Sequence, residues 1–146
     1  MEYFIRSVKP DDIFSVIKIA YETLPERYNP TVFNHFYESF PSGFLVAEHH
    51  HKLIGFIVGI QTQPGIVKIL MLAVRKKYRR QKLGSSLLEH FLKAMLQQNI
   101  SRIDLEVRTN NTPAITFYQQ HGFTIVDTLY KFYQNGEDAH IMRKML

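Results

Sequence analysis

The alternation of apolar and polar positions predicts a chain of seven strands and four helices. Period-two alternation or short apolar runs predict strands, which cover residues 3–8, 44–48, 53–63, 66–74, 102–107, 124–133 and 138–145. Apolar spacing of three and four predicts helices, which begin near residues 12, 31, 84 and 112. The resulting order, β-α-α-β-β-β-α-β-α-β-β, is typical of a mixed α/β sheet with a crossover helix between its fourth and fifth strands.

Turn and capping residues mark the ends of these predicted elements. Asp11 or Asp12 is expected to cap the first helix, and Pro25 and Pro30 end it in a loop. Three adjacent histidines at positions 49–51 lie at the tip of a predicted hairpin, where neighbouring side chains point in different directions. We therefore interpret them as solvated turn residues and expect no metal site.

Residues 69–88 combine an apolar strand, a basic loop and a helix start. The loop has six cationic residues among the eight from Arg75 to Lys82, and an apolar helical pattern follows Gly84. Backbone N–H groups at a helix start have no partner within the helix and attract phosphate oxygens. The combination predicts a phosphate site, whereas the basic run alone is more typical of a solvated surface or a nucleic-acid patch.

Composition narrows the class of protein. The length of 146 residues fits a single domain over 1–146. Cysteine is absent, which excludes disulfides, thiolate-zinc sites and a cysteine nucleophile. We expect a cytoplasmic protein without a membrane span or signal peptide. The net charge of +5 favours a polyanionic partner such as a nucleotide cofactor, nucleic acid or the ribosome.

Four segments resemble motifs of the GNAT acetyltransferase superfamily. Residues Arg79 to Gly84 resemble its acetyl-CoA signature, with Lys82 in place of the first glycine. Residues 105–123, the C-terminal stretch 130–142 and the Leu24-Pro25-Glu26-x-Tyr28 loop resemble ribosomal-protein alanine and archaeal protein N-terminal acetyltransferases. The resemblance implies the GNAT fold, a mixed, mostly antiparallel seven-stranded sheet flanked by four helices.

The resemblance also implies a set of cofactor-binding residues for acetyl-CoA. The strand before the basic loop is expected to bind the pantetheine arm, and backbone N–H groups of the loop and helix start are expected to bind the phosphates. Asn111 matches a family position that contacts the cofactor arm, although it is equally well placed to cap a helix. The predicted contacts are Leu72, Ala73, Val74, Arg79, Arg80, Gln81, Lys82, Leu83, Gly84, Ser85, Asn111 and Tyr118.

Three residues match catalytic positions of that branch. Glu106 matches a general base, with an ion pair to Arg102 or Arg108 as the structural alternative. Tyr118 matches the proton donor to the departing thiolate, and a core aromatic is its alternative. Glu26 matches a carboxylate near the substrate amine, or else is a surface charge.

The resemblance implies a protein or peptide N-terminus as substrate, with ribosomal proteins as one candidate. Glu26, Tyr28 and Tyr133 are expected to line its groove. An α-amine with a pKa near 7.8 is roughly one-seventh neutral at pH 7, whereas a lysine is neutral only about once in 2,500. The alternative functions are a small-amine acetyltransferase and a non-catalytic nucleic-acid-binding module, and the second is the less favoured of the two. Both a monomer and a homodimer fit the sequence.

Overall fold

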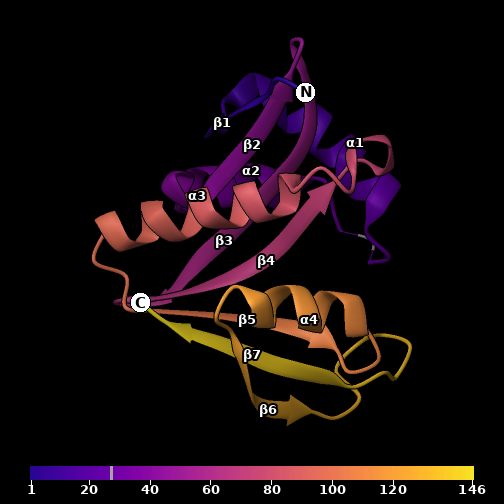
Figure 1. Ribbon diagram of the computed structural model, residues 1–146, viewed down its shortest axis with the longest axis vertical. Coiled ribbons are helices and arrows are strands. Elements are labelled where there is room, and N and C mark those ends of the chain that lie inside the picture. Colours follow the sequence, from indigo (N-terminus) through magenta and orange to yellow (C-terminus); the bar gives the residue numbers. More distant parts are fainter. Residues whose placement is uncertain (27) are drawn as a thin grey trace. The chain divides into compact units, whose positions relative to one another are not determined.

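The structure is a computed structural model that describes residues 1–26 and 28–146 (Figure 1). Within these residues the chain forms seven strands and four α-helices in the predicted order. The strands are β1 (Phe4–Ser7), β2 (Phe44–His49), β3 (Lys52–Gln63), β4 (Ile66–Val74), β5 (Arg102–Arg108), β6 (Thr124–Leu129) and β7 (Ala139–Met145). The helices are α1 (Ile13–Thr23), α2 (Thr31–Ser39), α3 (Leu83–Gln97) and α4 (Thr112–Gln120).

The chain divides into two compact units. The first consists of residues 1–60 and 69–99, and the second of residues 61–68 and 100–146. The boundary therefore passes through β4, whose first three residues belong to the second unit. The single domain expected for residues 1–146 stays a prediction. Among the described residues, no helix has the length and apolar character needed to cross a membrane.

The first unit is built on antiparallel strands and three helices. β1 pairs with β2, and β2 pairs with β3. Large apolar side chains from these strands and helices are fully buried together, among them Phe33, Phe44 and Phe56. α3 buries one face through Leu83, Leu87, Leu88, Phe91 and Met95, which follows the spacing in the sequence.

Two turns in the first unit differ from the predictions. The hairpin between β2 and β3 turns on His50 and His51 alone, both left-handed with φ of 49° and 64°, so His49 and Lys52 pair as strand residues. Asp12 does not cap α1 with its side chain. Its carboxylate instead accepts hydrogen bonds from Arg6 at 2.7 and 3.0 Å and from the Lys9 backbone N–H at 2.7 Å.

The second unit has strands in the order β5-β7-β6, and β7 pairs antiparallel with both β5 and β6. β6 ends at Leu129, four residues before the predicted end. The cause is a hydrogen-bonded loop: the Lys131 backbone N–H donates to Asp138 with Lys131 at a left-handed φ of 54°, and the Tyr133 N–H donates to the Glu137 carbonyl. A longer hairpin would have to break these bonds.

Candidate active site

The predicted phosphate site lies in the first unit, where β4 leads into α3. A short 3-10 turn at Lys76–Tyr78 follows β4, and α3 begins at Leu83 without a side-chain cap. The first α-helical hydrogen bond joins the Ser86 N–H to the Lys82 carbonyl at 3.0 Å. In the first turn of such a helix, backbone N–H groups have no acceptor within the helix and suit an anion.

Two residues of this turn have left-handed backbone. Arg80 has a φ of 65° and Lys82 a φ of 59°. Alternating left- and right-handed residues turn successive N–H groups toward one side, an arrangement that binds phosphates. Lys82 thus takes the conformation that the family's usual glycine would adopt freely, at a cost of about 1 kcal/mol. The geometry fits the pyrophosphate of a nucleotide cofactor.

The cationic side chains of the turn have different roles. The Arg79 Nε donates to the Val74 carbonyl at 3.1 Å, so this guanidinium ties the turn back to the end of β4. Arg80, Gln81 and Lys82 are exposed. On β4 itself, the buried Ala73 lies between the half-buried Leu72 and Val74, the residues predicted to follow the cofactor arm.

The loop with Glu26 and Tyr28 also belongs to the first unit. Glu26 is half-buried, and Arg27, where the family more often has asparagine, lies outside the described residues. The Tyr28 ring packs edge-on against Phe33 at 6.3 Å, and the Tyr21 hydroxyl donates to the Tyr28 carbonyl at 2.9 Å. One side of the Tyr28 ring is therefore occupied by packing against the core.

Glu106 lies on β5 in the second unit with only 11% of its side chain exposed. Its Oε1 forms an ion pair with the Lys68 ammonium from the first residues of β4. The predicted alternative, a pair with Arg102 or Arg108, is wrong. Those arginines bind Asp104 and Glu137 instead, because these carboxylates lie beside them while Lys68 approaches Glu106 from the neighbouring strand.

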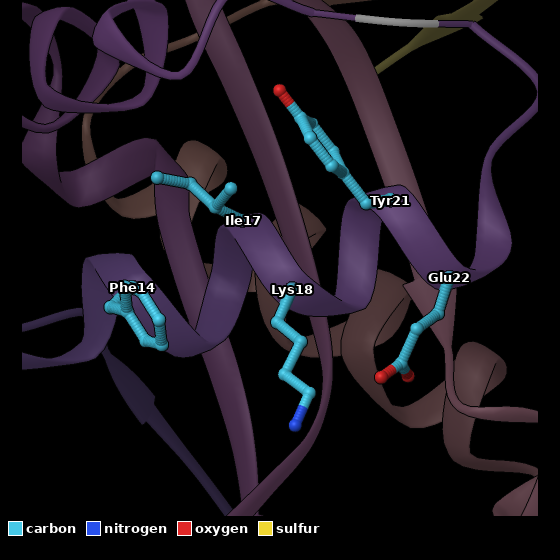
Figure 2. Close-up of a pocket in the computed structure, with 5 residues that line it drawn as sticks. All are labelled: Phe14, Ile17, Lys18, Tyr21 and Glu22. Carbon is cyan, nitrogen blue, oxygen red and sulfur yellow. The ribbon is translucent and has the colours of Figure 1, made fainter.

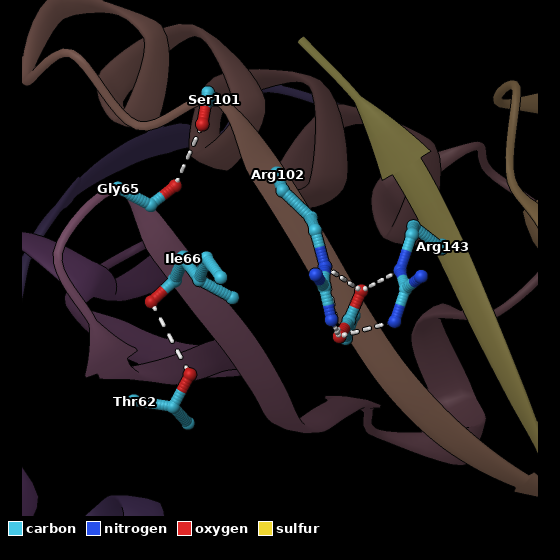
Figure 3. Close-up of polar contacts among 7 residues, drawn as sticks. Thr62, Gly65, Ile66, Ser101, Arg102 and Arg143 are labelled. Carbon is cyan, nitrogen blue, oxygen red and sulfur yellow. Dashed lines mark hydrogen bonds and ion pairs between the residues drawn. The ribbon is translucent and has the colours of Figure 1, made fainter.

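Asp104, two residues before Glu106, is held between two arginines. Arg102 and Arg143, both labelled in Figure 3, donate to it at distances from 2.7 to 3.3 Å. Burial alone would raise the pKa of Asp104, but the hydrogen bonds from Arg102 and Arg143 outweigh it and hold that pKa below its usual value. This face of β5 is therefore a row of paired charges.

Tyr118 lies on α4 among aromatic rings. Its ring packs edge-on against Phe117 at 5.1 Å and Phe123 at 5.5 Å. The side chain is half-buried, and burial raises the pKa of its phenol well above the usual value. The hydroxyl therefore keeps its proton across the physiological pH range.

Asn111 begins α4, as one of its two interpretations predicts. Its side-chain oxygen accepts a hydrogen bond from the Ala114 N–H at 3.3 Å. A capping asparagine retains its side-chain NH₂ for a second partner. The cap is thus compatible with the predicted contact to the cofactor arm.

Tyr133, in the loop between β6 and β7, is held by residues that the sequence analysis did not assign to it. The Arg108 guanidinium lies 4.0 Å from the centre of its ring and 3.6 Å from the Glu137 carboxylate. Asn110 donates to the same carboxylate at 2.9 Å. The only indication in the sequence was that Arg108 and Asn110 lie two and four residues after Glu106.

A separate groove lies on the outer face of α1, with a volume of about 410 Å³ (Figure 2). Its five lining residues recur at helical spacing, and three of them are apolar or aromatic. None is a predicted site residue. They are Phe14, Ile17, Lys18, Tyr21 and Glu22.

The predicted residues are thus divided between the two units. The first unit holds the strand and turn from Leu72 to Ser85 together with Glu26 and Tyr28. The second holds Glu106, Asn111, Tyr118 and Tyr133. Within the second unit, β5 and the segment that follows it supply the carboxylate, the cap and the phenol from thirteen consecutive residues.

A strand-turn-helix anion site followed by a carboxylate strand is the arrangement of a CoA-dependent acyltransferase. Residues 13–123 match the acetyltransferase (GNAT) family, and the chain belongs to this family. The predicted fold class, enzyme class and acetyl-CoA as cofactor are thereby confirmed.

Relatives narrow the class further. An N-alpha-acetyltransferase of Sulfurisphaera tokodaii is 35% identical, over 97% of this chain and 92% of the relative. The crystal structure of Ard1 from Thermoplasma volcanium superposes with a TM-score of 0.96 at 34% identity, covering 100% of this chain and 99% of that one. Naa50 of Arabidopsis thaliana, solved with the bisubstrate analogue CoA-Ac-MVNAL, has a TM-score of 0.87 at 28% identity and full coverage of both chains. The predicted resemblance to protein N-terminal acetyltransferases is confirmed.

Proposed function

We propose that this chain transfers acetyl from acetyl-CoA to the α-amine of a protein or peptide N-terminus, by direct transfer in a ternary complex. The observation that carries the proposal is the mostly buried Glu106 carboxylate on a strand that continues into the Asn111 cap and the Tyr118 helix. The relatives named N-alpha-acetyltransferase support the choice of amine. Cysteine is absent, so a covalent acetyl-cysteine intermediate is excluded.

The chemistry of the acceptor agrees with this choice. A carboxylate is a weak base, and it suffices only when the amine is neutral for a useful fraction of the time. Roughly one α-amine in seven is neutral at pH 7, against about one lysine in 2,500. A site whose base is a carboxylate therefore favours N-termini over lysine side chains.

The residues of the first unit are assigned to holding the donor. Backbone N–H groups from Arg79 to Ser85 bind the phosphates, with the left-handed Arg80 and Lys82 setting their direction. Leu72, Ala73 and Val74 line the pantetheine arm. When bound, acetyl-CoA supplies an acetyl group activated as a thioester, and we assign a backbone N–H near Leu72 to stabilising negative charge on its carbonyl oxygen.

Two residues of the second unit are assigned to the reacting groups. Glu106 accepts a proton from the α-ammonium form of the N-terminus, directly or through a water molecule, so that the nitrogen lone pair is free to attack. We assign Tyr118 to the departing thiolate. Because burial raises the pKa of its phenol, we assign it hydrogen-bond donation to the sulfur rather than complete loss of its proton.

Glu26, Tyr28 and Tyr133 are assigned to the peptide. Glu26 attracts the positively charged N-terminus, and the two tyrosines form walls of the groove. The bound analogue of the Naa50 relative includes a peptide beginning Met-Val, which supports a peptide acceptor here. A ribosomal-protein acceptor and a cytoplasmic location remain proposals, the latter supported by the absence of cysteine.

Mass spectrometry of two peptide pools tests the proposal. One pool has free N-termini and no lysine, and the other has blocked N-termini and lysine. Acetylation of the first pool alone is the expected result. Labelling of neither pool, with acetyl-CoA binding shown separately by calorimetry, would overturn it in favour of a small-amine acceptor.

A further inference from the structure

The ion pair between Lys68 and Glu106 joins two strands of the second unit. Lys68 comes from the first residues of β4 and Glu106 from the middle of β5, and the Lys68 ammonium contacts Oε1 of the carboxylate. The Lys68 side chain is 33% exposed, whereas that of Glu106 is 11% exposed. The lysine thus covers a carboxylate that has little contact with water.

Backbone hydrogen bonds fix where these two side chains meet. The Gly65 carbonyl accepts hydrogen bonds from the N–H groups of Ser101, at 2.8 Å, and Arg102, at 3.2 Å. The Ser101 hydroxyl donates to the same carbonyl at 3.2 Å, as Figure 3 shows. Lys68 lies three residues after Gly65, and Glu106 lies four residues after Arg102. Their meeting is therefore set by the register of the strands.

Lys68 is the only charged residue in β4, whose sequence is IVKILMLAV. The other eight residues of the strand are apolar, so the strand itself needs no charge at this position. The Glu106 carboxylate does need one, because a carboxylate that is only 11% exposed is costly to leave without a cation.

We infer that Lys68 is a positioning residue that orients the Glu106 carboxylate for proton transfer, an inference that rests on the proposed role of Glu106 as base. The ion pair with Lys68 engages Oε1 of the carboxylate and not Oε2. Oε2 is therefore the oxygen that receives the amine proton. When Lys68 fixes Oε1, the position of Oε2 is fixed as well, so the substrate nitrogen meets it from one direction. Holding reacting groups in a fixed orientation contributes strongly to catalysis.

The pair also sets the charge that an incoming peptide meets. An unpaired Glu106 would form a tight ion pair with the α-ammonium form of the substrate, which cannot attack a thioester. Lys68 neutralises that charge and weakens such ground-state binding, so the two effects of the lysine fall on turnover rather than on affinity.

Steady-state kinetics of Lys68→Met, Lys68→Arg and Glu106→Gln test the inference. We expect Lys68→Met to lower kcat about tenfold, without raising the KM for the peptide or for acetyl-CoA. Lys68→Arg keeps a cation next to Oε1 and should stay within about threefold of the natural enzyme. The double variant Lys68→Met/Glu106→Gln should be no slower than Glu106→Gln alone, because Lys68 acts through Glu106.

Arg143→Met is the matched control. It removes a cation from the same sheet of the same unit, and Asp104 keeps Arg102 as a partner. Its kcat should be unchanged, and circular dichroism should show all variants folded.

Two results would overturn the inference and leave the proposed function intact. One is a Lys68→Met enzyme with full kcat when Glu106→Gln is strongly impaired. The other is a double variant slower than either single variant by the product of their effects. Full activity of Glu106→Gln would instead contradict the role of Glu106 in the proposed function.

Discussion

The phosphate turn of the first unit and the β5 face of the second unit are built in different ways. In the turn, backbone conformation supplies the binding groups: two left-handed residues and a helix start, within seven consecutive positions from 79 to 85. On β5, the Glu106 side chain supplies the chemistry, and its partner Lys68 comes from a distant part of the sequence. The turn should therefore tolerate side-chain changes that the β5 face does not.

The largest expected effect is that of Glu106→Gln. Glutamine keeps the shape of the side chain and removes the base, so kcat on a peptide with a free N-terminus should fall by about 10²- to 10³-fold. Initial rates at several peptide concentrations, from pH 6 to 9, measure this change in kcat. Full kcat/KM across that range would show that β5 does not supply the base.

Tyr118→Phe should have the next largest effect. The variant keeps the aromatic packing against Phe117 and Phe123 but loses the hydroxyl. We expect kcat to fall about tenfold and the affinity for acetyl-CoA to change by less than about twofold. Calorimetric titration with acetyl-CoA separates the two quantities, and equal losses in both would assign Tyr118 to packing alone.

A smaller effect, on stability, is expected for Asp12→Asn in the first unit. Hydrogen bonds from Arg6, and also from the Lys9 backbone, hold the pKa of Asp12 below its usual value. A lowered carboxyl pKa stabilises the fold above the unfolded-state pKa, about 3.9, and the gain disappears as pH falls through the folded-state value.

At pH 7 the variant should lose about 1 to 2 kcal/mol of unfolding free energy. Urea unfolding at pH 7 and near pH 3 measures the difference, which should shrink at the lower pH. A loss that stays constant with pH would assign the effect to shape rather than charge.

The smallest effect is expected in the turn. Lys82→Gly removes the side chain from a left-handed residue, with φ of 59°, and should stabilise the protein by up to about 1 kcal/mol. The KM for acetyl-CoA should change by less than about threefold, since the backbone N–H is kept. A thermal-shift assay measures the change in stability, and kinetics at varied acetyl-CoA concentration measure the KM. A tenfold rise in KM would mean that the lysine side chain itself binds the phosphates.

The same contrast explains what the sequence could predict. Local signals identified all eleven elements, the strand-turn-helix site and the Asn111 cap, because each is determined by residues close together in the chain. The loop after Leu129 was missed, since its bonds depend on Asp138 and a left-handed Lys131.

The ion-pair partners were missed for a related reason. Lys68 is 38 residues from Glu106, and only the register of β4 against β5 brings them together. A single lysine in an apolar strand was the available indication. Arg108 was considered only as a partner for Glu106, whereas the structure places it over Tyr133 and beside Glu137.

The most direct test of the central claim uses one peptide that offers both kinds of amine, a free N-terminus and an internal lysine. Fragment-ion mass spectrometry after reaction with acetyl-CoA locates the added acetyl group. The proposed chemistry predicts acetylation of the α-amine, with the lysine unmodified at early times. Acetylation of the lysine Nζ ahead of the α-amine would contradict it.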